Sequence, residues 1–230
     1  AMLAACAAKG ETIITNAARE PEIVDLQTYL QRMGVYVRGA GTHTITVGDF
    51  KPRERVGHRV ITDRIASATA LCCAASAGGS VTLKDVTPQH FETVSSALNY
   101  MGCEIERKSN EVKITANKPL RAPKPVSTGP YPAFPTDAQP LLMAACLKAE
   151  GTTAFTENIF ENRFRHAMEL RRLGADISVV GKVAMITGVE KLIAAPVTAT
   201  DLRGGAAMVV AALAAEGETE VFDSGHIARG

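Results

Sequence analysis

Apolar and polar positions follow a pattern along this chain that repeats about every 70 residues. Three Thr-Asp pairs, at 62–63, 136–137 and 200–201, each open an Ala-rich apolar run that ends in glycine. A run that is apolar on all faces predicts a helix buried on most sides, and the short polar side chain before it predicts an N-terminal cap. A fourth run of this kind, AMLAACAAKG, opens the chain and closes at Gly10. The sequence therefore predicts one helical unit that is used several times.

A second repeated feature lies between these runs. Helical stretches end at Gly34, Gly102 and Gly174, and each glycine is followed by a short segment typical of a strand. The whole unit is predicted to run helix, strand, helix, strand, strand. In the middle unit these elements are predicted at 65–77, 80–83, 87–101, 103–107 and 111–115. In the other two, the elements after the capped helix are predicted at 13–14, 22–33, 35–38 and 44–47, and at 153–155, 163–173, 177–180 and 183–186.

Helices that are apolar on every face need neighbours on every face. Several units meet this need when their capped helices pack together inside and their sheets lie outside. The predicted fold class is therefore α/β. The first residue falls inside one unit and the last residue falls inside another, so we expect the chain to be a fragment.

Composition and charge argue against several classes of function. The formal net charge of +1 gives no overall attraction to nucleic acid or to an acidic membrane surface. The apolar runs are far shorter than the ~20 residues that span a bilayer. The five cysteines show no disulfide spacing, which favours a reducing compartment, and neither they nor the histidines form a metal-binding motif. Glycine-rich nucleotide loops and the nucleophile motif of serine hydrolases do not occur either.

The segment 119–135 interrupts the pattern with six prolines. Proline removes backbone donors and stiffens the chain. Since this segment leads directly to Asp137, it is either a brace that fixes that carboxylate or a structural crossover loop. The sequence favours neither interpretation.

The helix starts are the best candidates for chemistry, because the free N–H groups of a first turn favour anionic ligands. If the three equivalent starts converge on one pole, Asp63, Asp137 and Asp201 lie near one another with Arg64 and Arg203 beside them. The alternative is that each aspartate is an ordinary helix cap.

Arginines supply a second candidate feature, because guanidinium groups bind carboxylate and phosphate in a forked geometry. Arg163 lies on the same predicted helix as Arg165, Arg171 and Arg172, and Arg229 lies in the terminal segment. For the last three helical arginines, an exposed and solvated face is the default interpretation.

Several stretches of this chain resemble the bacterial UDP-N-acetylglucosamine 1-carboxyvinyltransferases, the enolpyruvyl transferases that begin peptidoglycan synthesis. The matching stretches are NAAREPEIVDL (16–26), PYPAFPTDAQP (130–140), FENRFRHAMELRRLGADI (160–177), GVEKLIAAPVTATDLR (188–203) and HIARG (226–230). The likeness covers essentially the whole chain. The sister enolpyruvyl transferase of the shikimate pathway shares the fold but not these motifs.

The resemblance implies a protein of two domains, each an inside-out α/β barrel of three pseudo-equivalent units, with the active site in the cleft between them. Residues 1–61 correspond to the end of one domain and residues 62–230 to most of the other. The reaction it implies joins phosphoenolpyruvate to the 3′-hydroxyl of UDP-N-acetylglucosamine and releases phosphate through a tetrahedral ketal. The implied setting is the cytoplasm, with no cofactor and no metal, at the first committed step of cell-wall synthesis.

Roles follow from the resemblance position by position. Asp137 is expected to hold the sugar hydroxyl and accept its proton. Ile159, through its backbone, and Phe160 are expected to contact the sugar nucleotide, while Arg163 and Arg229 clamp phosphoenolpyruvate. Supporting positions near the substrates are Asp201, Arg203, Arg64, Asp63 and Glu20.

The chain also departs from the family pattern. The Lys-Asn pair near the N-terminus of the family and its cysteine-bearing loop are both missing, and none of the five cysteines replaces the loop cysteine. We therefore expect the 230-residue chain alone to show no turnover and poor solubility. Two other hypotheses stay open: a non-catalytic half-enzyme that binds a sugar nucleotide or a partner, and an enolpyruvyl transferase for another acceptor.

Overall fold

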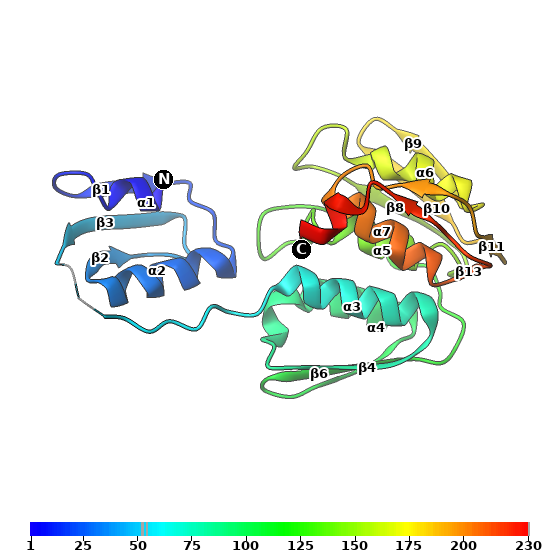
Figure 1. Ribbon diagram of the computed structural model, residues 1–230, viewed down its shortest axis with the longest axis horizontal. Helices are drawn as coiled ribbons and strands as arrows, with labels where there is room; N and C mark the ends of the chain where they lie inside the picture. The colour runs from blue at the N-terminus through cyan, green and yellow to red at the C-terminus, as the bar shows by residue number, and fades with distance from the viewer. Residues whose placement is uncertain (52, 54, 230) are drawn as a thin grey trace. The chain divides into compact units, whose positions relative to one another are not determined.

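The computed structural model describes residues 1–51, 53 and 55–229, with only the backbone described at residue 229. These residues form two units, whose elements are labelled in Figure 1. Unit 1 comprises residues 1–61 and 130–132, and unit 2 comprises residues 62–129 and 133 onward.

Unit 1 is a small α/β layer. Its elements are α1 (Met2–Ala5), β1 (Thr12–Thr15), α2 (Pro21–Met33), β2 (Val35–Arg38) and β3 (Thr44–Phe50). The strands form an antiparallel sheet in the order β1-β3-β2, and α2 packs against β2. Its core consists of the buried residues Met2, Ala5, Leu30, Val35, Val37, Ile45 and Val47.

Unit 2 contains three successive repeats. The first is α3 (Arg64–Ala77), β4 (Gly79–Lys84), η1 (Pro88–Phe91), α4 (Glu92–Met101), β5 (Glu104–Arg107) and β6 (Glu111–Ala116). The second is β7 (Val126–Ser127), α5 (Gln139–Ala145), β8 (Thr152–Thr156), η2 (Arg163–Arg165), α6 (His166–Arg172), β9 (Asp176–Val180) and β10 (Val183–Thr187). The third is β11 (Leu192–Ile193), β12 (Val197–Thr198), α7 (Leu202–Ala212), β13 (Ala215–Glu216), β14 (Val221–Phe222) and η3 (Ser224–Arg229).

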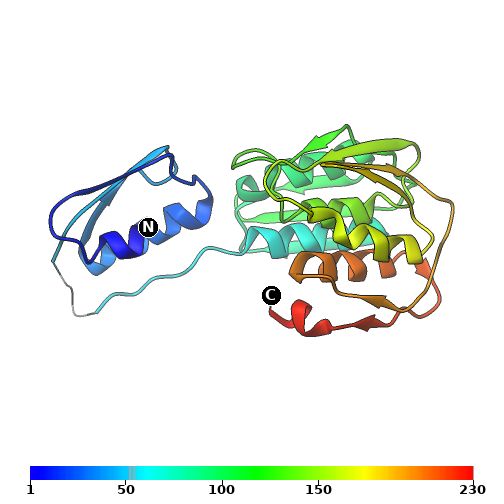
Figure 2. The same cartoon turned by 90° about the horizontal axis from the view of Figure 1, so that it is seen from above.

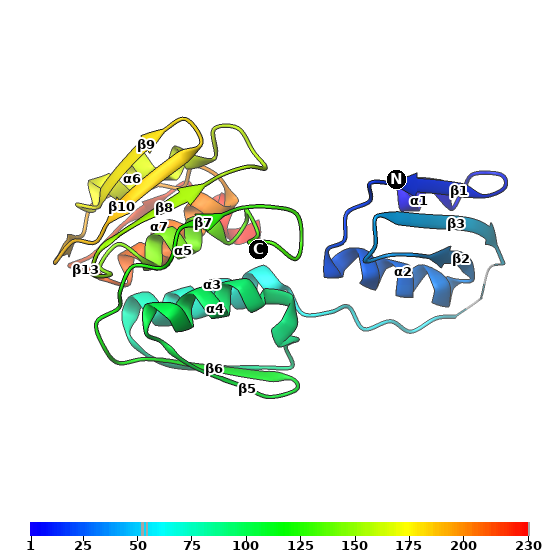
Figure 3. The ribbon, with the colours of Figure 1, turned by 180° about the vertical axis from the view of Figure 1, so that it is seen from behind.

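The first two repeats of unit 2 each form one sheet, and the third forms two separate two-stranded sheets. The first sheet is antiparallel in the order β4-β6-β5, and Figure 3 shows α3 and α4 on one side of it. The second has the order β7-β8-β10-β9, with β7 parallel to β8 and the other pairs antiparallel. In the third repeat β11 pairs with β13 and β12 with β14, both parallel.

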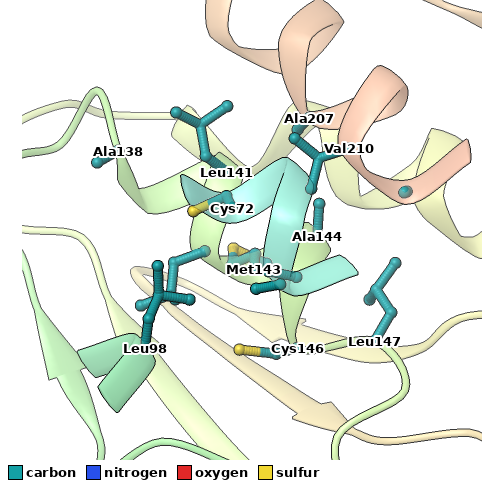
Figure 4. Packing of buried hydrophobic residues seen from close by; sticks show 14 of the residues in the cluster. Cys72, Leu98, Ala138, Leu141, Met143, Ala144, Cys146, Leu147, Ala207 and Val210 are labelled. Atoms are coloured by element: carbon teal, nitrogen blue, oxygen red, sulfur yellow. The ribbon is translucent and has the colours of Figure 1, made fainter. Parts of the chain in front are cut away.

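The capped helices α3, α5 and α7 pack against one another, and the view of Figure 2 shows α3 and α7 running side by side. Every residue of α5 is buried. The close-up of Figure 4 shows Leu141 and Ala144 of α5 in the same buried cluster as Cys72 of α3 and Val210 of α7. Small side chains let the helices approach closely, which explains the Ala-rich runs. The predicted α/β fold class is confirmed.

Most predicted boundaries match the structure within a residue or two. The predicted glycine stops are observed, with Gly34 at φ 102° after α2 and Gly102 at φ 114° after α4, a backbone conformation that favours glycine. The apolar runs, however, extend beyond their helices: α1 ends at Ala5 and α5 ends at Ala145. In both places the chain continues in tight turns with hydrogen bonds between residues three apart.

No helix within the described part of the chain is both long enough and apolar enough to cross a membrane.

Candidate active site

Asp137 lies just before α5, but its carboxylate does not cap that helix. The N-cap position is Ala138, which makes no side-chain cap bond. At the other two starts, the aspartate accepts hydrogen bonds from the amides two and three residues later. Here the third residue is Pro140, which has no N–H, and the amide of Gln139 donates to the Thr136 carbonyl oxygen at 3.3 Å. The expectation of a capping Asp137 is therefore wrong, and the carboxylate is available to other partners.

Two arginines bind the carboxylate that the helix does not use. Arg163 Nη2 donates to Asp137 Oδ1 at 2.9 Å, and Arg203 Nη2 donates to Asp137 Oδ2 at 3.2 Å. The Asp137 side chain is 39% exposed, whereas the two arginine side chains are 16% and 17% exposed. Both arginine Nε atoms are buried and have no hydrogen-bond partner among the described residues. Two cations share this one anion, so these three side chains together carry a charge of +1, and guanidinium groups bind anionic ligands.

Arg203 reaches this cluster from the first turn of α7, which Asp201 caps. Asp201 Oδ1 accepts hydrogen bonds from the amides of Arg203 at 3.0 Å and Gly204 at 2.9 Å. A Cβ added at Gly204 would collide with Thr200 Oγ1, so the turn can be this tight only with glycine. The third helix start thus combines an ordinary cap with an arginine that crosses to the second start.

Glu157, which the sequence patterns did not single out, connects the two sides of the cluster. It follows β8 and is 3% exposed. One carboxylate oxygen accepts from the amides of Ile159 at 2.8 Å and Phe160 at 3.1 Å. The other accepts from the Thr136 hydroxyl at 2.9 Å. The only signal in the sequence is a single acidic residue at the end of an apolar strand, which is too common to predict a role.

His166 forms a hydrogen bond with the backbone of Arg163. Its side chain is fully buried, and Nδ1 lies 3.1 Å from the Arg163 carbonyl oxygen, so that Nδ1 carries the hydrogen in this bond. Nε2 is buried without a partner among the described residues. Burial lowers the pKa of His166 from 6.5 to about 4, and the charge of Arg163 acts in the same direction. The hydrogen bond to the Arg163 backbone and the charge of Asp201 oppose this decrease in the pKa. The imidazole is therefore neutral at pH 7.

The proline-rich segment 119–135 forms a crossover that leads to α5. It supplies β7, which pairs in parallel with β8, and Thr128 then bridges to Phe134. The Gly129 amide donates to the Phe134 carbonyl oxygen at 3.0 Å, closing the loop that precedes Asp137. The crossover is thus observed, and the interpretation of the segment as a brace for the Asp137 carboxylate stays a prediction.

A hollow of about 570 Å³ adjoins the cluster, lined in part by Ile159, Phe160, Arg163 and Lys182. Ile159 and Phe160 are 40% and 54% exposed. The Arg163 guanidinium lies over the Phe160 ring, 5.4 Å from its centroid. The hollow thus offers an apolar wall and cationic groups side by side.

The other predicted residues belong to the first helix start of unit 2, to unit 1 or to η3. Asp63 caps α3 through the amides of Ile65 at 2.7 Å and Ala66 at 3.2 Å, and Arg64 is the first residue of that helix. Glu20 belongs to unit 1, just before α2, where its Oε2 is buried without a partner among the described residues. Arg229 ends η3, and its side chain lies outside the described residues, as does Gly230.

Within residues 1–51, 53 and 55–229, no group of three or more His, Cys, Asp or Glu side chains is placed to hold a metal ion. Burial raises the pKa of the Cys103 thiol to about 11 and the pKa values of Cys72, Cys73 and Cys146 as well. These thiols are therefore protonated at neutral pH and behave as small apolar core residues.

Comparison with known proteins places this geometry in a family. A family model described as EPSP synthase (3-phosphoshikimate 1-carboxyvinyltransferase) matches residues 1–230. UDP-N-acetylglucosamine 1-carboxyvinyltransferase 2 of Caldanaerobacter subterraneus subsp. tengcongensis is 48% identical over 229 residues, and UDP-N-acetylglucosamine 1-carboxyvinyltransferase 1 of Symbiobacterium thermophilum is also 48% identical over 229 residues. Both matches cover all of this chain but only 55% and 52% of the relatives. The chain thus spans about half the length of the curated relatives it matches, and their names agree with the resemblance stated from the motifs.

Solved structures give the same picture of the fold. The enolpyruvyl transferase NikO from Streptomyces tendae matches with a TM-score of 0.83 at 28% identity, over 99% of this chain and 55% of its own. EPSP synthase from Acinetobacter baumannii matches with a TM-score of 0.73 at 20% identity, over 99% of this chain and 56% of its own. At that identity the second match shows the fold alone.

Proposed function

The chain belongs to the EPSP synthase (3-phosphoshikimate 1-carboxyvinyltransferase) family, and from this premise we propose that it is part of an enzyme that transfers the enolpyruvyl group of phosphoenolpyruvate to the 3′-hydroxyl of UDP-N-acetylglucosamine. The relatives at 48% identity support this choice of acceptor. The structural observation that carries the proposal is Asp137, whose carboxylate is released from helix capping and is bonded by two arginines.

In the proposed reaction Asp137 accepts the proton of the sugar hydroxyl. A general base must lie within hydrogen-bond reach of the proton it takes, and a carboxylate that is 39% exposed is open to such a hydroxyl. Arg163 and Arg203 hold the carboxylate from its two sides and leave guanidinium hydrogens for the anionic groups of phosphoenolpyruvate. We also assign Ile159 and Phe160 to the wall that receives the sugar nucleotide.

The bond changes follow from the chemistry of the two substrates. The hydroxyl oxygen bonds to C2 of phosphoenolpyruvate while C3 gains a proton, which gives a tetrahedral ketal. In the second stage C3 loses a proton, the C2–O bond to phosphate breaks, and inorganic phosphate leaves. Positive charge from Arg163 and Arg203 stabilises the leaving phosphate and the carboxylate of the intermediate in this scheme.

The wider setting is part of the proposal. We assign the enzyme to the first committed step of peptidoglycan synthesis, in the cytoplasm, with no cofactor. The mutual packing of α3, α5 and α7 supports an inside-out barrel in which the helices lie inside and the sheets outside. Residues 1–61 and 62–230 are proposed to belong to two separate domains.

A second acceptor is the main competing hypothesis. The likeness to NikO, an enolpyruvyl transferase by its description, shows that this fold also occurs outside the two enzymes named above. Its identity of 28% is much lower than the 48% of the UDP-N-acetylglucosamine transferases, which is why we place it second.

The test is phosphate release by the full-length protein that carries this sequence, with phosphoenolpyruvate and one of two acceptors. UDP-N-acetylglucosamine is expected to support turnover, and shikimate 3-phosphate is expected to support none. Turnover with shikimate 3-phosphate alone would overturn the choice of acceptor. Release with neither acceptor would favour the non-catalytic hypothesis, which binding of UDP-N-acetylglucosamine by calorimetry then checks.

A further inference from the structure

Glu157 is a buried carboxylate that directly follows β8, and backbone hydrogen bonds hold this position. Its own amide donates to the Lys182 carbonyl oxygen at 2.8 Å, and the next amide, that of Asn158, donates to Thr128 Oγ1 at 2.9 Å. The side chain is 3% exposed. The backbone that carries it is therefore fixed to both neighbouring segments, the turn between β9 and β10 and the end of β7.

All the hydrogen bonds that the described residues donate to this carboxylate come from neutral groups. They are the amides of Ile159 and Phe160 and the hydroxyl of Thr136. A carboxylate taken out of water is stable only if such donors replace its hydration, and each bond to a charged acceptor is stronger than one to a neutral acceptor. A charged Glu157 therefore holds its three hydrogen-bond donors more strongly than a neutral side chain of the same length would.

The three bonds lead to the Asp137–Arg163 pair by two routes. One oxygen holds Thr136, the residue directly before Asp137. The other holds the Phe160 amide, and the Phe160 ring carries the Arg163 guanidinium at 5.4 Å from its centroid. The buried Glu157 side chain therefore contacts the segments that carry both members of the Asp137–Arg163 ion pair. These two residues are 26 positions apart in the chain.

We infer that Glu157 is a positioning residue for the reaction, which sets the placement of the Asp137 carboxylate relative to the Arg163 guanidinium. The inference rests on the proposed function, because it assigns Glu157 to the same site. Glu157 contributes to the lining of the hollow of about 570 Å³, but its side chain is 3% exposed, so in this inference it acts through Thr136 and through the 159–160 peptide groups.

The same bonds determine which ligand groups the 159–160 backbone accepts. The N–H groups of Ile159 and Phe160 both donate to Glu157, so a ligand that bonds to this backbone must do so through a carbonyl oxygen. A carbonyl oxygen accepts a hydrogen bond from a hydroxyl or an amide N–H and repels a phosphate oxygen. This stretch is therefore suited to the sugar part of a sugar nucleotide rather than to its diphosphate.

Two variants of Glu157 and one matched control test the inference. Glu157→Gln keeps the shape but removes the charge, and Glu157→Ala removes all three bonds. The control is Glu169→Gln, because Glu169 Oε2 also accepts a hydrogen bond from a backbone amide, that of Thr198 at 2.8 Å. All are made in the full-length protein that carries this sequence and assayed at a temperature at which circular dichroism shows each one folded.

In the kinetic measurement, we expect kcat to fall about tenfold in Glu157→Gln and about a hundredfold in Glu157→Ala, with smaller changes in KM. Thr136→Val is expected to add little to Glu157→Ala, because both break the same link. Glu169→Gln should keep the kcat of the unmodified protein. An unchanged kcat in folded Glu157→Ala would overturn the inference, because a purely structural glutamate affects stability and not turnover of the folded form.

Hydrogen exchange provides a readout that does not depend on activity. In Glu157→Gln the amides of Ile159 and Phe160 should exchange about ten- to a hundredfold faster, while Glu169→Gln leaves them unchanged. If the unmodified protein releases no phosphate, the proposed function fails, and this exchange result still decides whether Glu157 holds the loop. Unchanged exchange in Glu157→Gln contradicts the role of Glu157 whatever the activity.

Discussion

Asp63 and Asp137 occupy equivalent places in two repeats of unit 2, and their carboxylates have different partners. Asp63 Oδ1 accepts hydrogen bonds from the amides two and three residues later, at 2.7 and 3.2 Å. At Asp137 the third residue is Pro140, which has no amide hydrogen, and both carboxylate oxygens bond to arginines instead. Pro140 thus distinguishes the second helix start, where the aspartate forms long-range ion pairs, from the first, where the aspartate is a local cap.

This difference shows how a repeat fold acquires a site. The helix start supplies a carboxylate at a fixed place in every repeat, and its use depends on whether the first turn offers donors. The third start lies between the two extremes: Asp201 caps α7, while Arg203 beside it reaches Asp137. Chemistry is therefore expected where the local pattern is broken, at the second start.

The largest expected effect comes from removing an arginine that holds Asp137. Arg163→Gln and Arg203→Gln should each lower kcat/KM of the full-length protein about a hundredfold or more, because each loses a charge that faces the reacting groups. The measurement is steady-state phosphate release. Arg172→Gln, on the exposed side of α6, serves as the control. Equal losses in all three variants would mean that the effect of charge is general and that the second start is not special.

The next effect concerns stability and pH. Burial lowers the pKa of His166 to about 4 from 6.5, so the unfolded chain binds a proton more readily than the folded chain between these values. The stability of the folded state should therefore decrease as the pH falls from about 6.5, with a loss of about 3 kcal/mol by pH 4.

Urea unfolding of the chain at several pH values measures this loss. In His166→Asn, which keeps an N–H donor for the Arg163 carbonyl oxygen, the decrease between pH 6.5 and pH 4 should be smaller by the same amount. If the free energy of unfolding of this variant depends on pH as in the unmodified protein, other groups cause the loss of stability. The hydrogen bond to the Arg163 carbonyl oxygen would then not come from a buried neutral imidazole.

A smaller effect is expected at the third start. In Gly204→Ala the new methyl group collides with Thr200 Oγ1, which should lower the free energy of unfolding by about 1–3 kcal/mol. Gly225→Ala is the matched control, because a Cβ there meets no atom within 4 Å. Thermal unfolding of both variants checks this. If Gly204→Ala is as stable as Gly225→Ala, the first turn of α7 is not as closely packed as described.

The smallest effect should occur at Asp63. Asp63→Ala removes the cap of α3 and should cost about 1 kcal/mol of stability, whereas Asp63→Asn keeps a capping oxygen and should cost less. Chemical denaturation separates the two. A loss well above that of a cap, in both variants, would indicate that Asp63 has a further partner and resembles Asp137 more than the structure shows.

Much of the fold could be predicted from the sequence because its signals are local. Glycine stops at Gly34 and Gly102, and alternation in strands such as 35–38, depend on neighbours in the chain. The early ends of α1 and α5 were not predicted, because an Ala-rich run has the same helix propensity throughout and tight turns replace its last turns.

The candidate site could be predicted only in part. The Thr-Asp repeat predicts Asp137 as a candidate, and Pro140, which has no N–H to donate to a cap, is the feature of the sequence that distinguishes this start from the other two. Glu157 was missed because its partner Thr136 lies 21 residues away, and a contact at that distance leaves no periodic pattern. The likeness to a family supplied Arg163, whose place beside Asp137 depends on a turn that no local signal fixes.

The most direct test of this account measures two properties of Asp137→Asn in the full-length protein: kcat for phosphate release and the thermal midpoint, with Asp176→Asn as an exposed control. We predict a decrease in kcat of at least about a hundredfold with a thermal midpoint close to that of the control, since this carboxylate does not cap α5 and is proposed to act as a base. A kcat within a few fold of the control, together with the lowered midpoint expected of a lost cap, would contradict the account.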